Sequence, residues 1–144
     1  MANRVDPYAG FDFLVELDGI TAAGFSECHG LDVEVEVIEY REGTDKVNSV
    51  RKLPGLVKYT NITLKRGFTA DMSLWNWFKS VVNGQVQRTT GSIVLLDAAR
   101  NEVARWNFVN AWPSKWEGPR LCAKTSEVAI ETLVIEHEGL ELGS

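Results

Sequence analysis

The sequence predicts a mostly β domain in which about seven strands and one helix form a closed or nearly closed barrel or a small sandwich. Three observations lead to this prediction. Apolar and polar side chains alternate along most of the chain, which is the period of a half-buried strand. Only one segment has helical spacing. The 144 residues, 44% of them hydrophobic, suffice for a single domain, residues 1–144, with one core.

The first three strands are predicted near the N-terminus. Residues 11–18 alternate, and Asp18-Gly19 is typical of a turn. Residues 21–27 follow as a short second strand. The clearest amphipathic strand comes next, and we expect its apolar side chains to be buried and its acidic ones to point away from the core. These are Leu31, Val33, Val35 and Val37 on one face and Asp32, Glu34 and Glu36 on the other.

The alternation breaks over residues 41–54. This stretch is polar, contains Gly43, Asp45 and Asn48, and ends in Leu53-Pro54-Gly55. Such a composition is typical of a long loop or an extended arm. Residues 56–66 then resume as a strand.

The single helix is predicted over residues 74–82, where apolar side chains recur at helical spacing: Leu74, Trp75, Phe78, Val81 and Val82, with Trp77 at the edge of the stripe. Thr69 or Asp71 is suited to cap its start, and Asn83-Gly84 to end it. We expect the apolar stripe to cover one opening or one face of a sheet.

The remaining chain predicts a hairpin and a last long strand. Residues 85–97 and 102–112 form the hairpin, with Ala104, Trp106 and Phe108 on one face of its second strand. Residues 113–119 are expected to be a loop. The last strand covers residues 125–136. Its expected apolar face is Val128, Ile130 and Val134, and its other face is Glu127, Ala129 and Glu131.

Composition and charge exclude several classes of function. The net charge of −5 argues against a protein that grips nucleic acid, because such affinity comes largely from Lys and Arg meeting phosphates. No apolar run approaches the roughly 20 residues that cross a bilayer. The N-terminus lacks the apolar stretch of a secretory signal. We therefore expect a protein made in the cytoplasm that leaves the cell, if at all, inside a larger particle or by lysis.

A search for catalytic or cofactor chemistry finds no workable constellation. Cys28 and His29 are adjacent on a strand, so their side chains point to opposite faces. A pairing of Cys122 with His137 stays open, with nothing local to favour it. The Cys and His spacing does not fit zinc. The expectation is two small buried cysteines, no metal, no cofactor and no enzyme.

Three further clusters have competing interpretations. Gly19 and Gly24 have the spacing of a phosphate loop, but Phe25-Ser26 stand where the lysine and hydroxyl residue belong. Glu136 and Glu138 form either a carboxylate pair or, as is commoner, a solvated strand end. Trp112 and Trp116 flank Pro113 and suit a carbohydrate platform, a protein interface or a lid on the barrel.

Several long segments, in order, resemble the tail tube proteins of contractile phage tails and, more closely, of extracellular contractile injection systems. The segments are FLVELDGI (13–20), GFSECHGL (24–31), YREG (40–43), KLPGL (52–56), KYTNITLKRG (58–67), LWNWF (74–78), WNFVNAWP (106–113) and VAIETLVIEHEGL (128–140). The resemblance implies a fold shared with the type VI secretion tube protein, in which two sheets form a barrel with a helix on its side.

The same resemblance implies a non-enzymatic structural role. Six-fold rings of this chain would stack into a hollow tube. A sheath would surround the tube and drive it through a target envelope on contraction. A baseplate hub and spike would cap one end, and a tape-measure protein or cargo would fill the channel. No specific nucleic-acid binding and no stable membrane insertion are expected.

Two sets of site residues follow for such a tube. We expect the loop at 41–54 to carry ring stacking through charges of both signs. They are Arg41, Glu42, Asp45, Lys46, Arg51 and Lys52. We expect an acidic channel lining that does not retain acidic cargo, with Asp32, Glu34 and Glu36 as candidates; the alternative is that these carboxylates face solvent or the sheath.

Two rival functions remain at this point. One is a monomeric β-barrel that binds a small ligand, which would show a large apolar pocket. The other is an enzyme whose site is assembled from distant residues, which would show a polar cluster with perturbed titration in one cleft.

Overall fold

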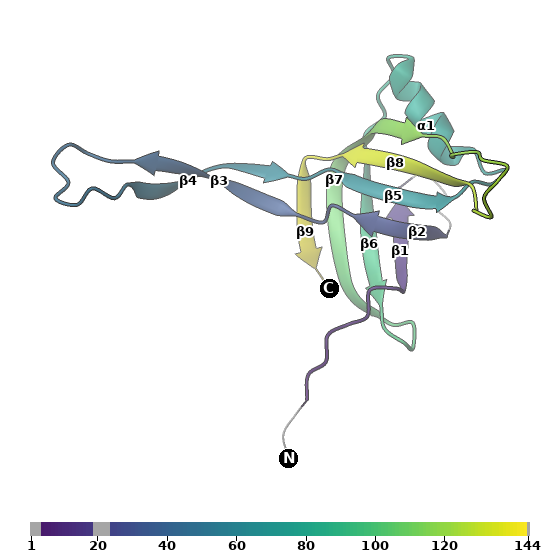
Figure 1. Ribbon diagram of the computed structural model, residues 1–144, viewed down its shortest axis with the longest axis horizontal. Helices are drawn as coiled ribbons and strands as arrows, with labels where there is room; N and C mark the ends of the chain where they lie inside the picture. Colours follow the sequence, from purple (N-terminus) through teal and green to yellow (C-terminus); the bar gives the residue numbers. More distant parts are fainter. Residues whose placement is uncertain (1–3, 19–23, 144) are drawn as a thin grey trace.

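The computed structural model describes residues 4–18 and 24–143, and its larger sheet is antiparallel and has seven strands (Figure 1). The order along the sheet is β1 (Phe13–Leu17), β6 (Thr89–Leu96), β7 (Glu102–Glu117), β8 (Ile130–Glu136), β5 (Ile62–Gly67) and β2 (Phe25–His29), with β9 (Gly139–Gly143) paired to β7 as well. The predicted second strand starts at residue 21, outside the described residues.

Strand β7 turns this sheet into two halves that enclose the core. Residues 102–111 pair with β6 and β9, whereas Trp112–Glu117 pair with β8. The change of partner coincides with Asn110, whose φ is 53°, and with a bulge after Pro113. In Figure 1, β1, β6, β7 and β9 run across the direction of β2, β5 and β8. Residues 113–117, which are predicted to begin a loop, therefore belong to strand β7.

The core lies between the two halves and contains aliphatic side chains from both. Its fully buried members include Ile62, Leu64, Phe108, Leu133 and Ile135. Helix α1 (Ser73–Val82) packs Leu74 and Trp77 into this core, beside β7. The helix lies where its spacing predicts it.

Strand β8 buries the face opposite to the one that its sequence predicts. Leu133, Ile135 and Glu131 are buried, and Ile130 is only half-buried. Glu131 is tolerated in the core because the Arg66 Nε–H donates a 2.8 Å hydrogen bond to its carboxylate. Arg66 also donates to the Asp71 carboxylate, at 3.1 Å. A buried charge is stable only when paired in this way.

The arm, residues 33–59, projects away from the rest of the molecule (Figure 1). Its strands β3 (Val33–Tyr40) and β4 (Arg51–Tyr59) pair only with each other. In the stretch 41–54, predicted as a long loop, residues 41–50 connect the two hairpin strands and residues 51–54 belong to β4. The strand predicted for residues 56–66 is two strands in different sheets.

The fold class is confirmed at the level of a mostly β chain with one helix and two sheets. Closure of the barrel is not found among the described residues, because β1 and β2 end the path through the large sheet and do not pair with each other. Strand β9 was not predicted, since its five residues contain only two apolar side chains between glycines.

Candidate functional site: the arm and the free sheet edges

The arm exposes an apolar surface that its own chain leaves uncovered. Every residue of β3 is exposed, and so is every residue of β4 except Gly55. Val33, Val35 and Val37, which the alternation predicts to be buried, are 50%, 46% and 59% exposed. Monomeric proteins seldom expose contiguous apolar patches of this extent without a partner. The apolar face that the alternation predicts is thus exposed to solvent in the single chain.

The tip of the arm is held by hydrogen bonds among its own residues. Asp45 is the centre of this network: its carboxylate accepts from the Glu42 backbone N–H at 3.0 Å and from Arg51 Nη2 at 2.8 Å. Arg41 donates to the carbonyl oxygens of Val47 and Asp45. Lys52 lies across from Glu39. Four of the six predicted stacking residues, Arg41, Glu42, Asp45 and Arg51, therefore meet in one structured tip.

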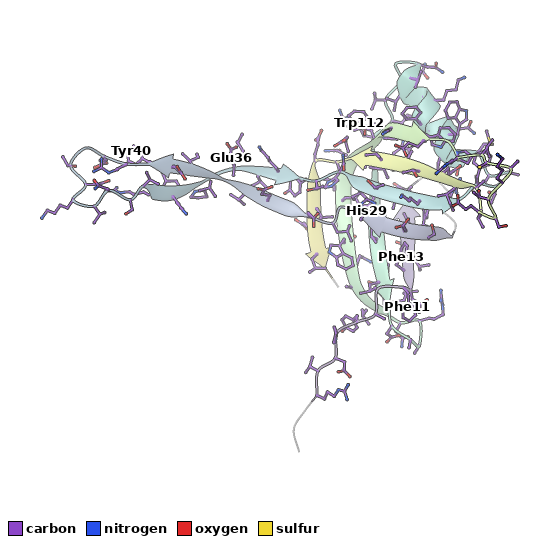
Figure 2. The ribbon with its side chains drawn as sticks, in the orientation of Figure 1. Phe11, Phe13, His29, Glu36, Tyr40 and Trp112 are labelled. Carbon is purple, nitrogen blue, oxygen red and sulfur yellow. The ribbon has the colours of Figure 1, made fainter. Side chains whose placement is uncertain are left out.

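The predicted channel residues lie at the base and middle of the arm. The Asp32 carbonyl oxygen accepts from the Thr60 N–H at 3.3 Å, where the arm leaves the body. Glu34 is paired across the hairpin with Lys58. Glu36 lies midway along the arm in Figure 2. The strand that carries these carboxylates is not part of the large sheet, and both of its faces are exposed. Their place in a channel lining stays a prediction.

The large sheet has edges that are unpaired among the described residues. Strand β1 pairs only with β6, β2 only with β5, and β9 only with β7. Each edge presents backbone N–H and C=O groups that another strand is able to bond. Together with the arm, these edges give the molecule several surfaces suited to protein partners.

A cavity of about 400 Å³ lies in the gap between β1 and β2. Its apolar lining comes from Phe13, Cys28, Leu31, Ile93, Leu95 and Trp106. Phe13 and His29 lie beside this gap in Figure 2. Burial raises the pKa of the Cys28 thiol to about 11, so Cys28 is a neutral thiol and a poor nucleophile near pH 7. The apolar lining of this cavity suits a small ligand.

The cysteines and histidines do not form a catalytic pair. Cys122 is exposed, contrary to the prediction, and Cys28 is half-buried. The His137 ring lies between the carbonyl oxygens of Thr60 and Gly139, at 2.9 and 3.1 Å from its two nitrogens, and is used at the base of the arm. Within residues 4–18 and 24–143, no cluster of three or more His, Cys, Asp or Glu side chains is placed to hold a metal ion.

The side chains of the carboxylate pair and of the tryptophan pair contact other parts of the fold. Glu136 accepts from Asn61 and Ser114, and Glu138 from Arg88 and Asn110. Trp116 packs edge-on against Trp75 of α1, with ring centroids 4.9 Å apart, so it is not free to form a flat sugar platform with Trp112. The glycine pair at 19 and 24 lies largely outside the described residues.

None of the described helices has the length and apolar character needed to cross a bilayer.

Comparisons with known proteins cover nearly the whole chain. The family described as T4-like virus tail tube protein gp19 matches residues 9–141. A chain of the PVC sheath-tube complex in its extended state, from an extracellular contractile injection system, is 27% identical over 96% of this chain and 92% of that chain, with a TM-score of 0.86. A chain from the anti-feeding prophage tube-terminating cap is 26% identical over 100% and 95%, with a TM-score of 0.89.

A more distant likeness concerns the fold alone. Hcp1 from Flavobacterium johnsoniae is 14% identical over 90% of this chain and 94% of that chain, with a TM-score of 0.55. Among curated proteins, none matches the chain.

Proposed function

The chain belongs to the family of the T4-like virus tail tube protein gp19, and from that premise we propose that six copies form a ring and that rings stack into the hollow inner tube of a contractile injection machine. The resemblance predicted from the sequence is thereby confirmed: the chain is a tail tube protein of contractile injection systems. It is a structural component and not an enzyme, like its family and its solved neighbours.

The observation that carries the proposal is the uncovered arm. A single copy exposes Val33, Val35 and Val37 at about half of their surface. The similar chains from the sheath-tube complex and the cap match 96% and 100% of this chain, so the similarity includes the arm. Repetition of one chain supplies a partner for every arm and for every free sheet edge.

We assign ring-to-ring stacking to the tip of the arm. Arg41, Glu42, Asp45, Lys46, Arg51 and Lys52 present both signs of charge on a structured hairpin end. Complementary charges of this kind fix register more than they add affinity. Replacing residues 44–50 by a short Gly-Ser turn is expected to leave single rings that do not stack, seen by negative-stain electron microscopy. Long tubes formed as readily as by the unmodified chain contradict the assignment.

The channel lining is proposed to include Asp32, Glu34 and Glu36, whose carboxylates lie on an exposed part of the arm. The competing surface is the outer face of β1 and β7, where Arg105 bonds both Glu16 and Glu102 at 2.8 Å. Cysteines placed at 34 and at 16 in assembled tubes, with Cys122→Ser as background, distinguish the two. Reagents too large for the channel label only the residue outside it.

The proposed partners follow from the machines in which the relatives occur. One similar chain is part of a sheath-tube complex, another of a six-fold symmetrised baseplate, and another of a sheath and tube terminator. By the same logic we propose a sheath around the tube that drives it on contraction, a hub and spike at one end, and a cargo or tape-measure protein in the channel. Synthesis in the cytoplasm and incorporation into a released particle belong to this proposal.

The test is to purify the chain and raise its concentration. Rings and tubes in electron micrographs, with six-fold end views, support the proposal. A species that sediments as a monomer at all concentrations contradicts it. A monomer would favour the rival function, a ligand-binding domain that uses the cavity between β1 and β2. The next measurement is then a screen for apolar ligands that quench tryptophan fluorescence.

A further inference from the structure

The strand register of the arm shows that its apolar side chains change faces halfway along the hairpin. In the half next to the body, Val33, Val35 and Val37 share one face with Val57 and Tyr59, and Glu34 and Lys58 occupy the other. In the half next to the tip, Glu39 and Lys52 continue the first face, whereas Ile38 and Leu53 belong to the second. The apolar face and the charged face are thus exchanged between residues 37 and 38.

A bulge lies at the point of exchange. Between the pairs Val35–Val57 and Val37–Pro54, strand β3 has one residue, Glu36, and β4 has two, Gly55 and Leu56. A bulge increases the local right-handed twist of a ribbon. Its position is fixed by packing, because a Cβ on Gly55 would lie 3.0 Å from the Ile38 side chain and 3.1 Å from the Glu36 carbonyl oxygen.

The twist of the arm turns the hairpin over at the point where its apolar and charged faces change places. In Figure 1, β3 and β4 cross once, so that the viewer sees one face of the hairpin in the half next to the body and the other face in the half next to the tip. Figure 2 places the crossing near Glu36. Since the apolar residues also change faces there, they point to the same side of the arm along its whole length.

We propose that the arm is one-sided: its continuous apolar side lies on the surface of a second copy of this chain, and its continuous charged side stays in contact with solvent. The apolar side consists of Val33, Val35, Val37, Ile38, Leu53 and Val57. The charged side contains Glu34 and Lys58 in one half, with the exposed Leu56 of the bulge beside them, and Glu39 and Lys52 in the other half, where Lys52 also belongs to the tip assigned to ring stacking. Arg51 is the exception near the tip, where it turns back to bind Asp45.

The second copy is the partner because none of the described residues, 4–18 and 24–143, covers the apolar side, and because a repeated chain offers one receiving surface for each arm. This step rests on the proposed function. On the charged side, residues of opposite charge lie across from each other in the hairpin register: Glu34 is opposite Lys58, and Glu39 is opposite Lys52. A side of that kind has no need of a partner, whereas an exposed apolar stripe is costly until it is covered.

Four single substitutions to threonine test the geometry. Threonine keeps strand propensity and removes either apolar contact or charge. Val35→Thr and Ile38→Thr lie on opposite faces of the hairpin but on the same, apolar side of the twisted arm. Glu34→Thr and Glu39→Thr lie likewise on the charged side. The measurement is the protein concentration at which tubes form, by sedimentation and electron microscopy.

One-sided docking is expected to raise this concentration about tenfold or more for Val35→Thr and Ile38→Thr, because each buries a hydroxyl. Glu34→Thr and Glu39→Thr are expected to change it by less than about threefold. Docking through one flat face instead would impair Val35→Thr and Glu39→Thr together, and that result overturns the inference while leaving the tube intact. An unmodified chain that forms no assembly overturns the proposed function, and the second copy as partner with it.

Discussion

The body and the arm of this molecule use the same alternating pattern for different ends. In β5 and β1, apolar residues such as Ile62, Leu64 and Val15 are buried by the same chain. In β3, an equally regular pattern leaves Val33, Val35 and Val37 exposed. The difference shows that alternation predicts a surface that is to be buried, but not the molecule that buries it. On the proposed function, part of the information in this sequence describes an interface between copies.

The largest difference between the two regions is expected from truncating one core side chain and one arm side chain. Phe108→Ala removes a ring that is 1% exposed, and should lower the free energy of unfolding by about 3–5 kcal/mol. Val57→Ala, at 52% exposure in the arm, should change it by less than about 0.5 kcal/mol in the isolated chain. Urea unfolding below the assembly concentration measures both. Comparable losses would mean that the arm belongs to the cooperative unit.

The next effect concerns the buried ion pair. Glu131→Ala leaves the Arg66 guanidinium in the core with only Asp71 as a carboxylate partner, and should cost about 3 kcal/mol of unfolding free energy. The matched control is Glu102→Ala, which breaks an exposed pair with Arg105 and should cost less than about 1 kcal/mol. Equal losses in the two variants would show that burial does not determine the strength of these pairs.

A smaller effect is expected from the two thiols. Cys28 borders the cavity at the edge of the body and Cys122 is exposed, and neither has a partner that would make it a nucleophile. The double variant Cys28→Ala, Cys122→Ala should lose less than about 1 kcal/mol of stability and assemble as the unmodified chain does. Normal tubes from the double variant that fail to deliver cargo would reveal a role for the thiols.

The smallest effect is a dependence of stability on pH. The pKa of the Asp71 carboxyl lies below its usual value, chiefly because it accepts the backbone N–H of Ser73 at the start of α1, with the Arg66 charge contributing. A group whose pKa is lowered by folding stabilises the protein above its unfolded pKa of about 3.9, and this contribution is lost as the pH falls through the lower, folded value.

Asp71→Asn should therefore flatten the acid side of the stability curve. Thermal unfolding from pH 6 to pH 3 measures this, with the exposed Asp6→Asn as the control. A curve as steep as that of the unmodified chain would exclude Asp71 as a source of the acid sensitivity.

The sequence predicts those parts of the fold in which local pattern and burial agree. Leu74 and Trp77 are at helical spacing, and both are buried by α1. The prediction fails for β8 because Glu131 is neutralised by Arg66, which is 65 residues away in the chain. It fails after Pro113 because β7, which has already changed partner at Trp112, continues through a bulge and pairs with β8 as far as Glu117. Neither partner is visible in a local window of sequence.

The candidate site could be predicted only in outline. Its location at residues 41–54 follows from a break in alternation, and Arg41, Glu42, Asp45 and Arg51 of that stretch contact one another at the tip. Their role in ring stacking stays a prediction. The alternation predicts the first hairpin strand over residues 31–37 and the second from residue 56, but the burial that apolar residues such as Val35 and Val57 suggest is not found. A local window of sequence does not show which molecule is to cover them.

The direction of the arm has a mechanical consequence. Its strands continue through short connections into β2 and β5, which run in line with the arm in Figure 1. A pull along the arm therefore slides β5 past β8, with which it is in register from Ile62–Ile135 to Gly67–Ile130. Under such shear all the hydrogen bonds between the two strands share the force at once, whereas a pull across them would open one after another. The subunit is thus built to resist tension along the same line on which its arm reaches out.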